Sequence, residues 1–221
     1  MLEITGNAFQ LLLTGFCAAN SIWQSFRTGF LAWTLLGLFA AGYFLGDLYW
    51  TLYLLFYHVT PEYAFIPDIS YYASHIFLLL LVTFVRYNSR LLFNRDAAEL
   101  RKKQQLNKLR ILILVLLFTI GMGIYFMQYG QYVSNTVYIM LMSGLLYNSM
   151  SGLLDLGEKG WKTAEGGVFL ATLFFCLVEY CAWFSSCIVE SSSPNSPYIW
   201  FESLLALGFC AFIPAIRRSV D

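Results

Sequence analysis

Charged residues are scarce in this chain. Only 12% of the 221 residues are charged, the net charge is zero and 59% are hydrophobic, whereas soluble domains carry about 25% charged residues. A soluble globule, a disordered chain and a nucleic-acid-binding protein are excluded, because each needs a solvated or a basic surface. The composition indicates an integral membrane protein whose main partner is the lipid bilayer.

Motifs of familiar catalytic and cofactor sites are also missing. The sequence contains no HExxH, GxSxG, Walker A or GxGxxG pattern, so nothing points to hydrolase or nucleotide chemistry. The five cysteines are odd in number and lack CxxC spacing, which is typical of small apolar residues. No lysine falls in an apolar run, which excludes a retinal Schiff base. We assign no catalytic residue, no metal and no cofactor.

Apolar runs of about the length of a membrane span recur seven times. They cover residues 5–23, 29–57, 69–85, 109–128, 132–152, 167–189 and 198–216. The first run is the most polar, and a signal peptide is its alternative, although no basic segment precedes it. We predict an all-α, polytopic membrane bundle of seven transmembrane helices that forms a single domain over residues 1–221.

Basic residues predict the direction of these helices. All 13 Lys and Arg residues fall at Arg27, in the connection 86–110, at 159–162 or after residue 216, which are alternate connections. The positive-inside rule therefore places the N-terminus outside and the C-terminus inside, in the plasma membrane. The connection 86–110 carries eight basic residues and is predicted to be cytoplasmic, where it either anchors on anionic headgroups or binds a cytoplasmic signalling partner.

A faint internal duplication relates the first three runs to the last three at an offset of 127 or 128 positions. Asn20 and Ser21 match Asn148 and Ser149, and the segment 67–71 matches 194–198. Matching runs have the same direction, so a 3+1+3 arrangement of parallel repeats would follow, with the fourth run as linker.

Three acidic residues, Asp47, Glu179 and Glu202, lie within apolar runs that contain no Lys or Arg. An ionised carboxylate at the centre of a bilayer costs about 2.5 to 3.5 kcal/mol on insertion scales, so each must face the bundle interior or find a partner. Asp47 and Glu179 both stand 10 residues before the outer ends of their runs. Two interpretations remain open for this pair: hydrogen-bonded carboxyls that join helices, or a ligand site.

Aromatic residues and one histidine accompany these acids. The candidate ligand-binding residues are Asp47, Trp50, Tyr43, Tyr71, His75, Glu179, Tyr180 and Glu202. An aromatic cavity with carboxylates in the outer half of the bundle suits a small cationic or amine ligand through cation–π contact. Protonated His75 would favour an anion instead, and aromatic packing without any ligand is the third alternative.

Residues 35–81 resemble a multi-pass membrane sensor module that bacteria fuse to diguanylate cyclases and histidine kinases. The resemblance rests on GDLYW at 46–50, which fits a GDxxW pattern, and on IPDISYYAS at 66–74, where Pro67 directly precedes Asp68. It implies a ligand-sensing module. In that family an output domain follows the last span, whereas five residues follow residue 216 here, so we expect a partner to supply the output.

Two further resemblances define the alternative functions. Gly46 and Asp47 with residues 73–75 are similar to segments of the YhhN-type lysoplasmalogenases, which would make the chain a membrane lipid hydrolase, although a second acidic motif is not found. The three-helix repeats are similar in architecture to SWEET and PnuC carriers, which implies a small-solute transporter. We predict a ligand-binding or sensing module, with a transporter as the main alternative and homo-oligomers compatible with either.

Overall fold

The computed structural model describes residues 2–58, 65–92, 98–128, 132–157, 160–188 and 197–220. The described part is helical and contains no strand, which confirms the all-α prediction. The helices are α1 (Leu2–Thr28), α2 (Leu31–Tyr57), α3 (Phe65–Leu92), α4 (Ala98–Met127), α5 (Tyr132–Leu156), the short 3-10 helix η1 (Gly160–Lys162), α6 (Ala164–Ile188) and α7 (Tyr198–Val220).

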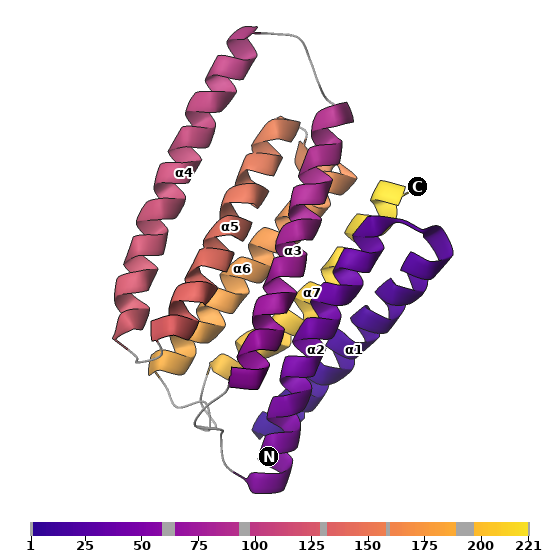
Figure 1. The fold of residues 1–221 in the computed structure, drawn as a ribbon, viewed down its shortest axis with the longest axis vertical. Helices are drawn as coiled ribbons and strands as arrows, with labels where there is room; N and C mark the ends of the chain where they lie inside the picture. The colour runs from indigo at the N-terminus through magenta and orange to yellow at the C-terminus, as the bar shows by residue number, and fades with distance from the viewer. Residues whose placement is uncertain are drawn as a thin grey trace.

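Figure 1 shows the long helices side by side, and by their contacts six of them form a closed ring. Helix α1 packs on α2 and α7, α2 packs on α3, α3 packs on α5, and α6 lies between α5 and α7. Helix α4 stays outside this ring at one edge of the molecule, where it packs on α5. The interior of the ring is therefore enclosed by α1, α2, α3, α5, α6 and α7.

Helices α2 to α7 each contain a stretch that is long and apolar enough to cross a membrane. The chain is a multi-pass membrane protein by this criterion. Helix α1 is not among these six, and it lies beside α2 and α7. That α1 also spans the membrane remains a prediction.

The helix ends correct the predicted connection at 86–110. Helix α3 continues to Leu92 and α4 begins at Ala98, so most of this segment is helical. The apolar runs underestimated both helices because backbone hydrogen bonding continues past the point where the side chains become polar. Residues 93–97 lie outside the described part of the chain.

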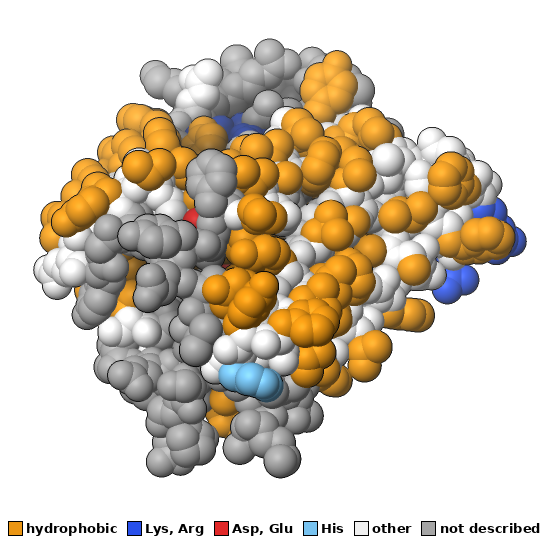
Figure 2. All heavy atoms as spheres, turned by 60° about the horizontal axis from the view of Figure 1, so that its bottom comes forward, with side chains coloured by type: hydrophobic (Ala, Val, Ile, Leu, Met, Phe, Trp, Pro, Cys, Tyr) orange, Lys and Arg blue, Asp and Glu red, His pale blue; other side chains and the backbone are white. Residues whose placement is uncertain are grey.

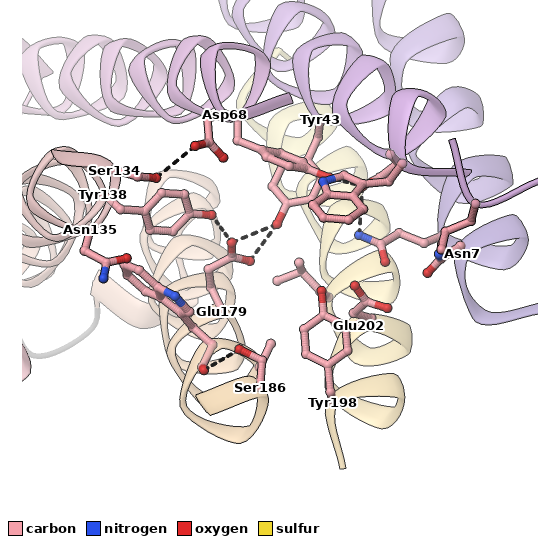
Figure 3. Close-up of a pocket in the computed structure, with 18 residues that line it drawn as sticks. Asn7, Tyr43, Asp68, Ser134, Asn135, Tyr138, Glu179, Ser186, Tyr198 and Glu202 are labelled. Atoms are coloured by element: carbon pink, nitrogen blue, oxygen red, sulfur yellow. Dashed lines mark hydrogen bonds between the residues drawn. The ribbon is translucent and has the colours of Figure 1, made fainter. Parts of the chain in front are cut away.

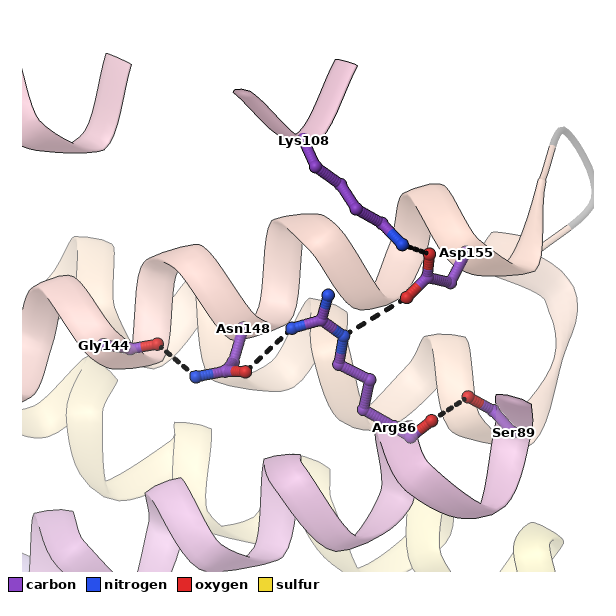
Figure 4. A network of polar contacts seen from close by, with 6 residues as sticks. All are labelled: Arg86, Ser89, Lys108, Gly144, Asn148 and Asp155. Carbon is purple, nitrogen blue, oxygen red and sulfur yellow. Dashed lines mark hydrogen bonds and ion pairs between the residues drawn. The ribbon is translucent and has the colours of Figure 1, made fainter. Parts of the chain in front are cut away.

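Arg86 is buried instead of resting on headgroups (Figure 4). Its Nε donates to Asp155 Oδ2 at 3.2 Å and its Nη1 donates to Asn148 Oδ1 at 2.9 Å. Lys108 forms an ion pair with the other carboxylate oxygen of Asp155. This network joins α3, α4 and α5, so part of the basic segment holds helices together.

Glycines allow α2 to approach its neighbours closely. A Cβ added at Gly46 would lie 2.6 Å from the Tyr71 ring, and one added at Gly42 would lie 3.1 Å from Ser74 of α3. The spacing of these two glycines predicts close packing, as found here. Gly121 and Gly123 of α4 have no such neighbour within 4 Å among the described residues, so they support no close approach of this kind.

Four fully buried phenylalanines, Phe39, Phe175, Phe209 and Phe212, fill the centre of the ring. Phe39 stacks on Phe209 with ring centroids 4.6 Å apart and lies edge-on to Phe175 at 5.3 Å and Phe212 at 5.8 Å. We call them the phenylalanine cluster. Tyr43, one turn along α2 from Phe39, contacts the cluster through Phe209 at 5.0 Å.

The molecular surface agrees with a lipid environment. Figure 2, in which the lower end of Figure 1 comes forward, shows hydrophobic side chains over much of the visible face. Basic side chains appear only near its margins, and acidic ones only inside a recess. The described acids that are visible in this view are therefore turned inward.

Candidate functional site

A cavity of about 430 Å³ opens between six helices on the Tyr43 side of the phenylalanine cluster. Its lining on α2 extends from Tyr43 to Leu54, a depth of about 16 Å at 1.5 Å per residue. The full lining is Asn7, Gln10, Tyr43, Asp47, Trp50, Leu54, Asp68, Tyr71, Ser134, Asn135, Tyr138, Glu179, Ala182, Trp183, Ser186, Tyr198, Glu202 and Leu205.

Glu179 of α6 is held by two tyrosines at the inner end of this lining (Figure 3). Tyr43 of α2 donates to both carboxylate oxygens, at 2.8 Å to Oε1 and 2.7 Å to Oε2. Tyr138 of α5 also donates to Oε1. Glu179 is only 7% exposed, and these donors replace the water that its carboxylate loses.

Asp47 of α2 is equally buried, but both of its donors reach the same oxygen. Tyr71 of α3 donates to its Oδ1 at 3.0 Å, and Gln10 of α1 donates to the same oxygen at 3.4 Å. The second oxygen, Oδ2, has no hydrogen-bond partner among the described residues. One face of this carboxylate is thus left without a protein donor.

The third and fourth acids lie on α3 and α7. Ser134 of α5 donates to Asp68 Oδ2 at 3.0 Å and accepts a hydrogen bond from Tyr72 at 2.6 Å. Glu202 lines the cavity beside Tyr198, both from α7 (Figure 3). Acids therefore reach the cavity from α2, α3, α6 and α7.

The lining has a single sign of charge. It contains four carboxyl groups and no Lys, Arg or His among the described residues. Six aromatic side chains complete it, namely Tyr43, Trp50, Tyr71, Tyr138, Trp183 and Tyr198. Carboxylates and aromatic faces both attract cations, so a positively charged occupant would meet favourable partners from several helices.

The structure brings six of the eight expected site residues to this cavity, namely Asp47, Trp50, Tyr43, Tyr71, Glu179 and Glu202. His75 and Tyr180 are not part of this lining. His75 is buried between helices, 4.7 Å from the Tyr138 ring, and its Nδ1 bonds to the Tyr71 carbonyl at 2.7 Å. Tyr180, next to Glu179 in sequence, projects to another side of α6 and meets Phe118 of α4 at 5.1 Å.

Sequence reasoning missed several polar residues of the lining. Tyr138 looked like an ordinary aromatic of a span, and Gln10 and Asn7 only seemed to make the first run less apolar. Gln10 and Tyr138 prove to be the donors that α1 and α5 provide to the two deep acids. A usable signal was present, because polar residues within apolar runs face the interior of a bundle.

The cavity acids are not arranged as a metal site. Within the described ranges, no three His, Cys, Asp or Glu side chains come close enough to hold a metal ion. Hydrogen-bonded carboxyls on separate helices are instead suited to binding a ligand through charge and hydrogen bonds.

Comparisons with protein-family models, with curated proteins and with solved structures found no match to this chain.

Proposed function

We propose that this chain is an integral membrane protein that binds a small organic cation in the cavity of its six-helix ring. The observation that carries the proposal is the lining itself. It has four carboxyl groups and six aromatic side chains, and it contains no Lys, Arg or His among the described residues. A buried carboxylate at membrane depth requires a compensating charge or donor. A cationic ligand supplies both.

The residues behind the resemblance to bacterial sensor modules support the same site. Asp47 and Trp50 of the GDxxW pattern line the cavity, and so do Asp68 and Tyr71 of the segment 66–74. Both segments of the resemblance thus contribute side chains to the same cavity. A sensing role for the bound ligand is the form of this function that the resemblance favours.

The ends of the helices support a site in the outer half of a seven-span protein. The cavity lies where α1, α3, α5 and α7 begin, and Arg27, Lys108 and Lys162 lie toward the opposite end of the bundle. The N- and C-termini are also at opposite ends (Figure 1). With cations on the cytoplasmic side, the cavity faces outward and α1 is the seventh span.

The test is a binding panel on the purified full chain in lipid nanodiscs. Tryptophan fluorescence, which Trp50 and Trp183 of the lining should report, is followed during titration with butylamine, 2-phenylethylamine and choline. Butyrate and phenylacetate serve as anionic controls of matched size. We expect saturable binding of at least one cation and none of either anion, and binding of the anions alone would overturn the proposal.

Transport of the cation is a second candidate, favoured by the pairing of residues around the cavity. Helices α1, α2 and α3 occupy the same relative places as α5, α6 and α7, since α1 packs on α7 as α5 packs on α3. Lining residues of the two halves also occupy matching positions, and two of the pairs are identical. The pairs are Asn7 with Asn135, Gln10 with Tyr138, Asp47 with Glu179, Trp50 with Ala182, Leu54 with Ser186 and Tyr71 with Tyr198.

These pairs have an offset of 128 positions for α1 and α5, 132 for α2 and α6, and 127 for α3 and α7. A site between two parallel repeats is typical of carriers that rock one unit against the other. In this arrangement the phenylalanine cluster would close the inner side. Uptake of a labelled cation into proteoliposomes separates a carrier from a sensor, because a sensor binds the cation without accumulating it.

A further inference from the structure

We propose that Asp47 binds the charged nitrogen of the ligand through an N–H hydrogen bond to Oδ2, so that the site selects amines with at least one N–H over quaternary ammonium ions. The inference rests on the proposed function, since it names the ligand class of that same cavity. It begins from the unequal hydrogen bonding of the two deep acids, Asp47 and Glu179.

Glu179 has little capacity left for a ligand. Both of its oxygens accept from Tyr43, at 2.8 and 2.7 Å, and Oε1 accepts from Tyr138 as well. The two tyrosines come from different helices, so the carboxylate joins α2, α5 and α6. Glu179 therefore acts as a positioning residue that fixes the inner end of the cavity and adds negative charge.

Asp47 is incomplete by comparison. Its Oδ1 accepts from Tyr71 and, at a longer distance, from Gln10, whereas Oδ2 has no partner in the part of the chain that the structure describes. The residue is only 7% exposed and lines the cavity, and Oδ2 itself is fully buried. A buried oxygen of this kind forfeits its hydration, so a donor that it meets when the carboxylate turns toward the cavity would relieve it.

The surroundings of Asp47 favour a cationic N–H as that donor. Trp50, one turn along α2, lines the same cavity and offers an aromatic face, while Tyr71 fixes the orientation of the carboxylate through Oδ1. An ammonium N–H donates to a carboxylate in a charge-assisted bond that is roughly twice as strong as a neutral one. A trimethylammonium group keeps the charge but has no hydrogen to donate, so it leaves Oδ2 unpaired.

The experiment compares two matched pairs of probes, butylamine with butyltrimethylammonium and 2-phenylethylamine with its N,N,N-trimethyl derivative. Affinities are measured for the full chain in nanodiscs and for three variants: Asp47→Asn, Glu179→Gln and the control Asp68→Asn. Asp68 is a carboxylate of the same lining, but Ser134 already donates to its Oδ2.

In the wild-type protein we expect each amine to bind about tenfold or more tightly than its trimethyl derivative. Asp47→Asn should bring that ratio close to one, whereas Glu179→Gln and Asp68→Asn should weaken both members of a pair alike and preserve the ratio. Thermal unfolding of each variant shows whether it is folded. If Asp47→Asn does not fold, Asp47→Glu is measured in its place. That variant keeps the carboxylate but moves it, so its ratio of amine to trimethyl affinity should fall below that of the wild type.

Failures of the two proposals are distinguishable. Equal affinity of wild type for amine and trimethyl probes would overturn the role of Asp47 while leaving a cation site in place. A ratio that survives Asp47→Asn but collapses in Glu179→Gln would assign the nitrogen to the other acid. Absence of binding by all four cations would overturn the proposed function and this inference together.

Discussion

Replacing Tyr43 by phenylalanine tests the hydrogen bonding that holds the deep end of the cavity. The change removes one hydroxyl and keeps the ring, so contacts with the phenylalanine cluster remain. Tyr180→Phe is a matched control, because Tyr180 is 5% exposed and Tyr43 is 4% exposed. The hydroxyl of Tyr43 donates to Glu179 at 2.7 and 2.8 Å, whereas that of Tyr180 has no hydrogen-bond partner among the described residues.

The expected magnitude follows from these contacts. A hydrogen bond to a charged group contributes about 1.5 to 3 kcal/mol in soluble proteins, and interhelical ones measured within membranes reach about 1.7 kcal/mol. We therefore expect Tyr43→Phe to lower the free energy of unfolding by about 1 to 2 kcal/mol. Tyr180→Phe should change it by about zero, or raise it slightly, since a buried hydroxyl without a partner is removed.

The assay is unfolding in mixed micelles titrated with sodium dodecyl sulfate, followed by circular dichroism. A difference of about 1 kcal/mol between the two variants is about a fivefold difference in the unfolding equilibrium. Equal destabilisation by both changes, or a larger loss in Tyr180→Phe, would refute the assignment of Tyr43 as the main support of Glu179.

Three further predictions concern packing, pH and topology. Gly46→Ala should destabilise the protein by about 1 to 3 kcal/mol, because the added Cβ would displace the Tyr71 ring. The control Gly121→Ala has open space around it and should not destabilise the protein. Equal melting temperatures of the two variants would contradict this reasoning. Cation binding should weaken from pH 8 to pH 5 as the lining carboxyls take up protons, and a flat affinity profile would remove them from recognition. In intact cells a cysteine placed at Glu62 should react with an impermeant thiol reagent and one at Gln104 should not, whereas the reverse would invert the topology.

Composition and apolar periodicity were sufficient to predict the helical class and most helix positions, because membrane helices must satisfy their own backbone hydrogen bonds. Asp47 and Glu179 stood out for a similar reason, since a carboxyl in an apolar run needs an interior location. The orientation of a side chain around its helix was harder to predict. Tyr180 and Glu179 are neighbours in sequence, yet only Glu179 lines the cavity, because successive residues of an α-helix point about 100° apart.

Partners on other helices could not be predicted at all from one sequence. Arg86 was expected to anchor on headgroups or to bind a cytoplasmic partner, but it meets Asp155 and Asn148 of α5. That pairing depends on how α3 lies against α5 in the ring, which apolar runs do not specify. The same holds for Tyr138, whose importance comes from facing Glu179 of α6.

Helix α4, which lies outside the ring, has a bearing on how such a chain could arise. Two three-helix units that point the same way cannot be joined by a loop, because three crossings leave the chain on the wrong side of the bilayer. One additional crossing restores the direction, and in the proposed 3+1+3 arrangement α4, which packs on α5, would provide it. If the two units arose from separate three-helix subunits, those subunits would need no counterpart of α4, and α4 would be the natural place to divide the chain into two co-expressed halves.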